Sequence, residues 1–298
     1  MPTQTATLSI EHETHYRYSA AVDLAQHLAY LCPLADERQQ VERHEVQIDP
    51  RPLHHSSADD VFGNRRMVFT VNVPHRALSV RASSRVCVTP RAVTAPSLAW
   101  EAVRERLRYC AGAAFEPAAE FTAPSPYVPR LAALRELALP SFTPGRPLAE
   151  AAIDLMGRIH AGFEYDSSST EVETPLAQVL QTRRGVCQDF AHLMIGALRL
   201  MGLAARYTSG YLLTTPPAGE VAMLGADASH AWLAAWCPRV DGSADWLELD
   251  PTNNAQPASS HVRLATGRDY GDVTPLRGVI RGGGEHRFEV RVRTERVS

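Results

Sequence analysis

The sequence predicts an α+β fold in two parts, an antiparallel β region followed by a core of helices and strands. Over the first hundred residues, apolar and polar side chains alternate with the period of two that is typical of strands. A proline-rich stretch follows, and beyond it the apolar spacing becomes helical. At 298 residues, the chain is long enough for two domains. We expect a β-rich domain at 1–95, a connector at 96–147, a core at 148–258 and a C-terminal extension at 259–298.

The β-rich domain is predicted from short segments of alternating character. The first runs from Leu8 to Tyr18, and the others lie at 46–48, 67–73 and 78–88. Turn residues separate these segments, which favours an antiparallel, sandwich-like arrangement. We also expect a helix to interrupt the strands over 24–31.

The connector and the core follow from proline positions and from helical spacing. Proline recurs through the connector, which we expect to wrap the surface of the core with short helices at 100–110 and 131–139. Pro147 suits the first turn of a helix, and Gly202 suits the position just after the end of one. The core is predicted to contain helices at 148–163, 174–180 and 186–201 and strands at 205–213, 231–237 and 246–249. A last strand is predicted at 288–294.

Charge and hydropathy exclude several classes of partner. The formal net charge is −3 and the pI is about 6.5, so no electrostatic reason favours a nucleic acid or an anionic membrane. The segment 1–18 lacks the basic and apolar regions of a signal peptide. The longest apolar stretch, 193–203, contains Arg199 and is too short to span a bilayer. We expect a cytoplasmic protein with no membrane partner.

The basic and sulfur-containing residues add two constraints. All 30 basic residues are arginine, so the chain offers no lysine side chain as an acceptor for cross-linking to itself. Its five cysteines are scattered and form no CxxC pair, so neither a zinc ribbon nor a dithiol redox motif is indicated. In a reducing cytoplasm these thiols are expected to be free.

One cysteine lies at a predicted helix start. The segment 183–193 reads RRGVCQDFAHL, in which Gly185 marks a turn and Cys187 falls in the first helical turn. Unpaired backbone N–H groups and the helix dipole stabilise an anion at this position, so a thiolate forms there more easily than in solution. The same N–H groups can donate to the oxyanion of a tetrahedral intermediate. Taken alone, however, a free cysteine is more often a small core residue.

A histidine and a carboxylate complete a pattern. His230 begins a predicted strand, and Asp250 ends the next one, where Pro251 stops it. On neighbouring strands the two side chains can hydrogen-bond, which would fix the imidazole tautomer and stabilise the imidazolium. Each residue alone fits a structural role. A helix-borne cysteine with two strand-borne partners in this order is the papain-type arrangement.

These motifs resemble those of the bacterial transglutaminase-like family of cysteine peptidases and acyltransferases. The resemblance implies a papain-like transglutaminase core, with Cys187 as nucleophile, His230 as general base and acid, and Asp250 as the residue that orients His230. It extends over nearly the whole chain. The matching segments are RRGVCQDFAHL at 183–193, SHAW at 229–232, LDPTNN at 249–254, HYRY at 15–18, DVFGN at 60–64, PSPYVP at 124–129, GRDY at 267–270 and PLRGV at 275–279.

Three further residues are candidates for the oxyanion site or for support of the triad. Enzymes of this type often add a side-chain donor to the oxyanion hole, and Tyr165 is the candidate. Gln188 directly follows the nucleophile. Trp232 lies two positions after His230 on a strand and so shares its face, where it could shield the His–Asp pair from water or simply be core.

Other residues near the motifs favour structural roles. Asp189 lies in the first helical turn, where the helix dipole favours its negative charge. His192 lies about 140° around an ideal helix from Cys187, which places it away from the thiolate and argues against a shared zinc site. Cys237 has the opposite strand parity to His230 and is expected to be a core thiol. We expect no metal and no cofactor.

The predicted chemistry is acyl transfer through a thioester on a peptide or isopeptide amide. Hydrolysis, by a peptidase or amidase, is the favoured outcome. Transfer to an amine, as in a transglutaminase, is the first alternative, and a non-enzymatic module that binds a peptide or partner is the second. The N-terminal β domain is also a candidate surface for a protein partner.

Overall fold

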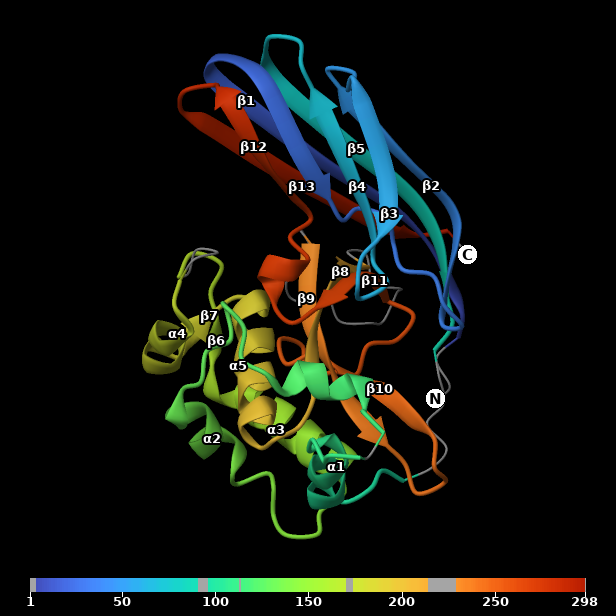
Figure 1. The fold of residues 1–298 in the computed structure, drawn as a ribbon, viewed down its shortest axis with the longest axis vertical. Helices are drawn as coiled ribbons and strands as arrows, with labels where there is room; N and C mark the ends of the chain where they lie inside the picture. Colours follow the sequence, from blue (N-terminus) through green and yellow to red (C-terminus); the bar gives the residue numbers. More distant parts are fainter. Residues whose placement is uncertain (1–3, 91–95, 113, 170–173, 214–228, 298) are drawn as a thin grey trace.

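The computed structural model describes residues 4–90, 96–112, 114–169, 174–213 and 229–297 (Figure 1). An antiparallel β domain lies above a core in which helices pack on one side of a second sheet. The ends of the predicted β domain and the stretches 170–173 and 214–228 of the predicted core lie outside the described residues.

The N-terminal sheet has seven strands, two of which come from the C-terminal end of the chain. Its order is β2-β5-β1-β4-β3, and β12 and β13 also pair with β1. Every pairing is antiparallel. The strands are β1 (Ala6–Ala29), β2 (Gln39–Asp49), β3 (His54–Asp59), β4 (Arg65–Val71), β5 (His75–Val88), β12 (Leu276–Gly282) and β13 (His286–Arg296).

The long strand β1 joins two parts of this sheet. Its first part pairs with β5 and β13, its second part pairs with β4 and β12, and the pairing with β5 shifts between Arg17 and Val22. Side chains from both parts meet in one apolar cluster, in which Phe69 of β4 and Leu78 of β5 are buried. The sandwich-like character that was predicted therefore arises from a single sheet that folds over its own core.

The helix predicted over 24–31 is wrong, because residues 24–29 belong to β1 and residues 30 and 31 follow it outside any helix. Ala25, His27 and Ala29 alternate as buried positions, and the strand is hydrogen-bonded to β4 on one side and β12 on the other. Pairing on both edges outweighs the local helix preference of leucine and alanine, as tertiary context commonly does.

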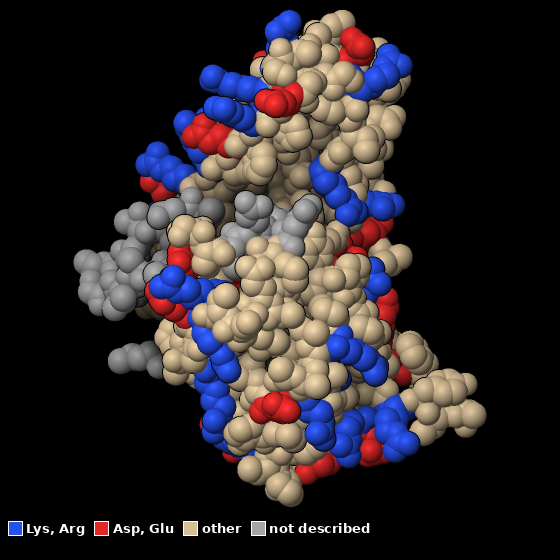
Figure 2. Space-filling model, turned by 90° about the vertical axis from the view of Figure 1, so that its left-hand side faces the viewer, with Lys and Arg blue, Asp and Glu red and all other residues tan. Residues whose placement is uncertain are grey.

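Charged side chains cover the exposed face of the N-terminal sheet as neighbours of opposite sign. Arg81 of β5 pairs with Glu11 and Glu13 of β1, and Arg85 lies 2.8 Å from Glu42 of β2. Figure 2 shows the same interspersed blue and red on one face of the whole molecule. Exposed pairs of this kind contribute little stability and are typical of a solvated surface.

The connector is packed into the core. It contains α1 (Trp100–Leu107), a 3-10 turn at Pro117–Thr122 and α2 (Ala132–Ala138). Val103, Leu134 and Phe121 are buried in the same apolar cluster as the core helices. The connector therefore extends the core as well as wrapping it.

The core places its helices against a four-stranded antiparallel sheet of order β10-β9-β8-β11. Helix α5 contacts β8 and β9, and its described residues from Asp189 to Arg199 are buried. Within the described residues, no helix is long and apolar enough to cross a membrane. The elements are α3 (Leu148–Gly162), β6 (Glu164–Tyr165), α4 (Leu176–Thr182), β7 (Arg184–Gly185), α5 (Cys187–Leu200), β8 (Ala205–Leu212), β9 (Ser229–Pro238), β10 (Ala244–Leu249) and β11 (His261–Gly267).

Two expected boundaries shift in the structure. The core limit at residue 258 falls too early, because β11 is the edge strand of the core sheet. Pro147 is the cap before α3 and not a residue of its first turn. The last strand, β13, pairs with β1 and so returns the chain to the N-terminal sheet.

Side-chain amides from the N-terminal domain close the free edge of β11. Gln39 accepts from the Arg263 backbone N–H at 2.8 Å and donates to the Arg263 carbonyl at 2.8 Å. Asn64 does the same with Thr266, at 2.7 and 2.8 Å. The two amides thus satisfy backbone groups that an additional strand would otherwise bond.

Candidate active site

Cys187 is the first residue of α5, and the local sequence explains this helix start. The backbone N–H of Val186 donates to Asp189 Oδ2 at 2.9 Å, which satisfies one of the unpaired donors at the helix end. A Cβ at Gly185 would lie 2.8 Å from the same oxygen, so only glycine fits beside this cap. Cys187 itself is partly exposed and can be reached from solvent. Asp189 therefore has the structural role expected from its position.

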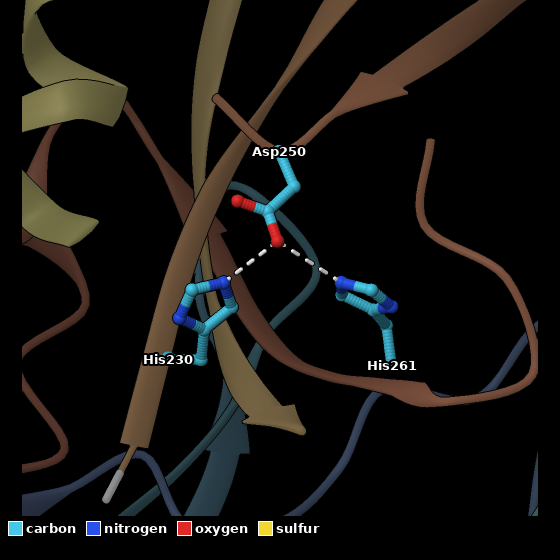
Figure 3. Close-up of side chains that lie close together, drawn as sticks. All are labelled: His230, Asp250 and His261. Carbon is cyan, nitrogen blue, oxygen red and sulfur yellow. Dashed lines mark hydrogen bonds and ion pairs between the residues drawn. The ribbon is translucent and has the colours of Figure 1, made fainter. Parts of the chain in front are cut away.

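His230 and Asp250 meet at the ends of the adjacent strands β9 and β10. His230 is the second residue of β9, and Asp250 directly follows β10. His230 Nε2 lies 2.9 Å from Asp250 Oδ2, and neither side chain is exposed (Figure 3). A hydrogen bond at this distance between buried groups fixes the ring orientation, as expected from the sequence.

The Asp250 carboxylate is held by several donors. Oδ1 accepts from the backbone N–H groups of Thr252 and Asn253 at 3.0 and 3.3 Å. Oδ2 accepts from the Asn253 side chain at 2.7 Å, and His261 Nε2 lies 3.3 Å from it. Burial acts most strongly on Asp250 and raises the pKa of its carboxyl, but His230 and His261 outweigh it and hold that pKa well below its usual range.

His230 is arranged to carry a positive charge between Asp250 and Cys187. Burial is the largest influence and lowers the pKa of His230, but Asp250 and then Cys187 outweigh it, and the pKa rises to about 10. Nδ1, the ring nitrogen not used by Asp250, has no aligned hydrogen-bond partner among the described residues. Cys187 therefore raises the pKa of His230 although Nδ1 makes no well-aligned hydrogen bond. Catalytic hydrogen bonds often tighten only when substrate binds.

Trp232 shares the face of His230, as its position two residues along β9 predicts. The two rings are stacked with centroids 5.9 Å apart. Trp232 also meets His261 edge-on at 5.2 Å, and it is fully buried. Its ring therefore covers the His–Asp–His group on one side and keeps water from it.

The other two candidate support residues lie close to the helix start. Tyr165 of β6 pairs with Gly185 of β7, two residues before Cys187. Its ring meets Phe190 of α5 edge-on at 6.4 Å. Gln188 is the next residue of α5 after Cys187 and is partly exposed. Both positions are near the nucleophile, and their roles stay predictions.

His192 and Cys237 are buried residues of the core. Burial lowers the pKa of His192 to about 3, and its Nε2 accepts from the Tyr270 backbone N–H at 3.2 Å. Its ring is packed against Tyr207, 5.0 Å away. Cys237 is fully buried, and burial raises the pKa of its thiol.

His261 is a site residue that sequence reasoning missed. It lies on β11, 3% exposed, and shares Asp250 Oδ2 with His230 (Figure 3). His230 Nε2, His261 Nε2 and Asp250 Oδ2 lie within 4.8 Å of one another, a spacing that would also suit a metal ion. Hydrogen bonds account for this cluster, because both distances are in the hydrogen-bonding range. No local motif marks His261, because its contact with Asp250 depends on the pairing of β11 with β8.

Most of the chain matches known protein families and relatives. Residues 8–87 match the bacterial transglutaminase-like N-terminal region, and residues 136–251 match the core of the transglutaminase-like superfamily. An uncharacterized protein of Mycobacterium tuberculosis is 43% identical over 276 residues, which cover 91% of this chain and 86% of that one. The chain belongs to the bacterial transglutaminase-like family. In this family context, the motifs at 183–193 and 249–254 lie within or at the end of the matched core.

More distant proteins are also similar. A Mycobacterium leprae protein is 29% identical over 294 residues, 98% of this chain and 99% of that one. A protein-glutamine gamma-glutamyltransferase of Pseudomonas aeruginosa is 28% identical over 142 residues, 41% of this chain but 20% of that one. A crystal structure of a protein provisionally named a cysteine protease, from Cytophaga hutchinsonii, superposes with a TM-score of 0.76 over 99% of this chain and 92% of that one, at 20% identity. The last match confirms the predicted fold class.

Proposed function

We propose that this member of the family is a cysteine-dependent acyltransferase that acts on a peptide or protein amide through a thioester. The observation that carries the proposal is the position of His230 between two groups that both favour its protonated form. Asp250 lies 2.9 Å from Nε2, and Cys187, at the start of α5, acts on the same ring. This is the arrangement that a thiolate–imidazolium pair requires.

The reaction divides into two steps. The Cys187 thiolate attacks the amide carbonyl, and the oxyanion forms near the backbone N–H groups that begin α5. His230 gives its proton to the leaving amine, the C–N bond breaks and a thioester to Cys187 remains. His230 then takes a proton from the acceptor as it attacks, the bond between the acyl carbon and sulfur breaks, and the Cys187 thiolate and the His230 imidazolium are restored. Asp250 keeps the His230 ring in place throughout.

Water is the acceptor that we favour, so the enzyme would be a peptidase or amidase. Water is the default acceptor for a thioester unless a groove excludes it. The Pseudomonas relative named a protein-glutamine gamma-glutamyltransferase supports amine transfer as the second candidate. A glutamine peptide with a fluorescent amine distinguishes the two. Ammonia release without label is expected for hydrolysis, whereas faster label incorporation would favour amine transfer.

The first test is the reactivity of the thiol. Alkylation by iodoacetamide, mapped by peptide mass, should modify Cys187 faster than the exposed Cys110 below pH 7. His230→Ala should remove this advantage, and His55→Ala, at an exposed histidine of β3, should not. If Cys187 reacts no faster than Cys110 in the wild type, the proposal that the protein is an enzyme fails. A module that binds a peptide then becomes the better description.

A further inference from the structure

One carboxylate oxygen of the site serves two histidines. Asp250 Oδ2 lies 2.9 Å from His230 Nε2 and 3.3 Å from His261 Nε2, and Figure 3 shows the rings on opposite sides of it. The other nitrogen of His261, Nδ1, lies 3.0 Å from Ser260 Oγ, a hydroxyl that can donate to it. These contacts favour a His261 ring whose Nε2 carries a proton and donates to Asp250, while Nδ1 accepts from Ser260.

We infer that His261 is a positioning residue for acyl transfer. It holds the Asp250 carboxylate in the orientation that directs His230 Nδ1 toward Cys187. This inference rests on the function proposed above. Apart from the base His230, the remaining side-chain donor to Oδ2, Asn253, and the two backbone donors to Oδ1 all come from the loop that follows Asp250. Among the described donors to this carboxylate, His261 is the one besides His230 that lies on a separate, hydrogen-bonded strand, so it fixes the carboxylate relative to the core sheet.

The titratable groups linked to this oxygen, directly or through His230, come from four elements. Cys187 lies on α5, His230 on β9, Asp250 after β10 and His261 on β11. Trp232 packs against both histidines and contributes no charge. A change at His261 is therefore transmitted to Cys187 through Asp250 and His230.

The N-terminal domain supports the strand that carries His261. On one edge, β11 pairs with β8, where His261 faces Leu212. On the other edge, the amides of Gln39 and Asn64 hold residues 263 and 266 by paired backbone hydrogen bonds. The strand cannot shift without breaking these bonds. The β domain therefore acts on the active site through β11 and His261.

Two substitutions at His261 separate its contacts. His261→Gln places an amide near the position of Nε2 and keeps a donor to Asp250, whereas His261→Asn is too short to reach Asp250 but can still meet Ser260. We expect His261→Asn to slow Cys187 alkylation below pH 7 by about 10- to 100-fold and to shift its pH profile, because the base is misplaced. His261→Gln should stay within a few-fold of wild type. Equal behaviour of the two variants would overturn the inference.

The controls distinguish this inference from the proposed function. His55→Asn should leave the profile unchanged, and the Tm of each variant reports whether it folds. If wild-type Cys187 shows no selective reactivity, the proposed function itself fails. If it is reactive and folded His261→Asn matches it, only the positioning role fails. Should His261→Asn not fold, the 15N spectrum of histidine-labelled wild type decides, because a His261 Nε2 without a proton contradicts donation to Asp250.

Discussion

At the scale of single residues, the Asp250 carboxylate is the most constrained group of the site. It is fully buried and accepts from the loop that follows it and from side chains on two strands. A group held in this way can orient a base without becoming protonated itself, which is the role of the acid in a Ser-His-Asp triad.

Replacement of this carboxylate by its amide tests the role directly. Asp250→Asn keeps the shape but removes the charge that stabilises the His230 imidazolium, so we expect the rate of acyl transfer to fall by about three to four orders of magnitude. The measurement is single-turnover release from a glutamine peptide. Asp241→Asn, in the exposed turn between β9 and β10, is the matched control and should retain the wild-type rate. A drop of less than tenfold in Asp250→Asn would contradict the role.

The buried pair of His230 and Asp250 predicts how the stability of the protein depends on pH. The pKa of His230 is raised to about 10 in the folded protein. Its contribution to the free energy of unfolding is therefore complete below the pKa of an unfolded histidine, near 6.5, and is lost as the pH rises toward 10. The pKa of Asp250 is lowered in the folded protein. Its contribution to the free energy of unfolding is therefore complete above the pKa of an unfolded aspartate, near 3.9, and is lost as the pH falls.

Urea unfolding of wild type and Asp250→Asn as a function of pH measures this linkage. The difference in the free energy of unfolding should be greatest between about pH 4 and 6.5 and should decline on both sides. A difference that grows from pH 7 to pH 10 would have the wrong sign and would contradict the assignment of charge to His230.

The three triad positions were accessible from the sequence, whereas His261 was not. Cys187, His230 and Asp250 lie in local motifs whose turn and strand signals can be read from neighbouring residues. His261 reaches Asp250 only because β11 joins the core sheet beside β8. That contact depends on a pairing between strands distant in sequence, which local spacing does not encode.

At the scale of elements, the start of α5 depends on a glycine with a neighbour too close for any side chain. A Cβ at Gly185 would meet Asp189, whereas one at Gly157 within α3 has its nearest neighbour at 3.6 Å. Gly185→Ala should therefore destabilise the protein by about 1–3 kcal/mol and slow Cys187 alkylation. Gly157→Ala should instead stabilise it by about 0.4–1 kcal/mol, since alanine favours the helix. Thermal unfolding of both variants is the measurement, and equal shifts would contradict this account.

Strand β1 marks the limit of prediction at this scale. Strict alternation between Leu8 and Tyr18 predicts its first part, whereas the local sequence of its second part favours a helix. The second part pairs on both edges with strands from residues 67–71 and 276–282. Local spacing cannot report such partners, and the same reason explains why β12 was not predicted.

At the scale of the whole molecule, the two domains are expected to unfold together. All four tryptophans lie in the core part of the chain, at positions 100, 232, 236 and 246, so their fluorescence reports the core, whereas far-UV circular dichroism reports both sheets. Since β11 is held by Gln39 and Asn64, and the chain returns to β1 through β12 and β13, the two signals should give one midpoint. Separate midpoints would show that the β domain is an independent unit.

The amides that close β11 also bear on what happens when the chain is cut. A core produced without residues 1–95 would present β11 with its backbone donors and acceptors exposed along one edge. Such an edge recruits strands from other copies, so the shortened protein is expected to self-associate. The N-terminal domain would then serve as a built-in guard against aggregation, and proteolytic nicking between the domains would be a route to insoluble protein in the cell.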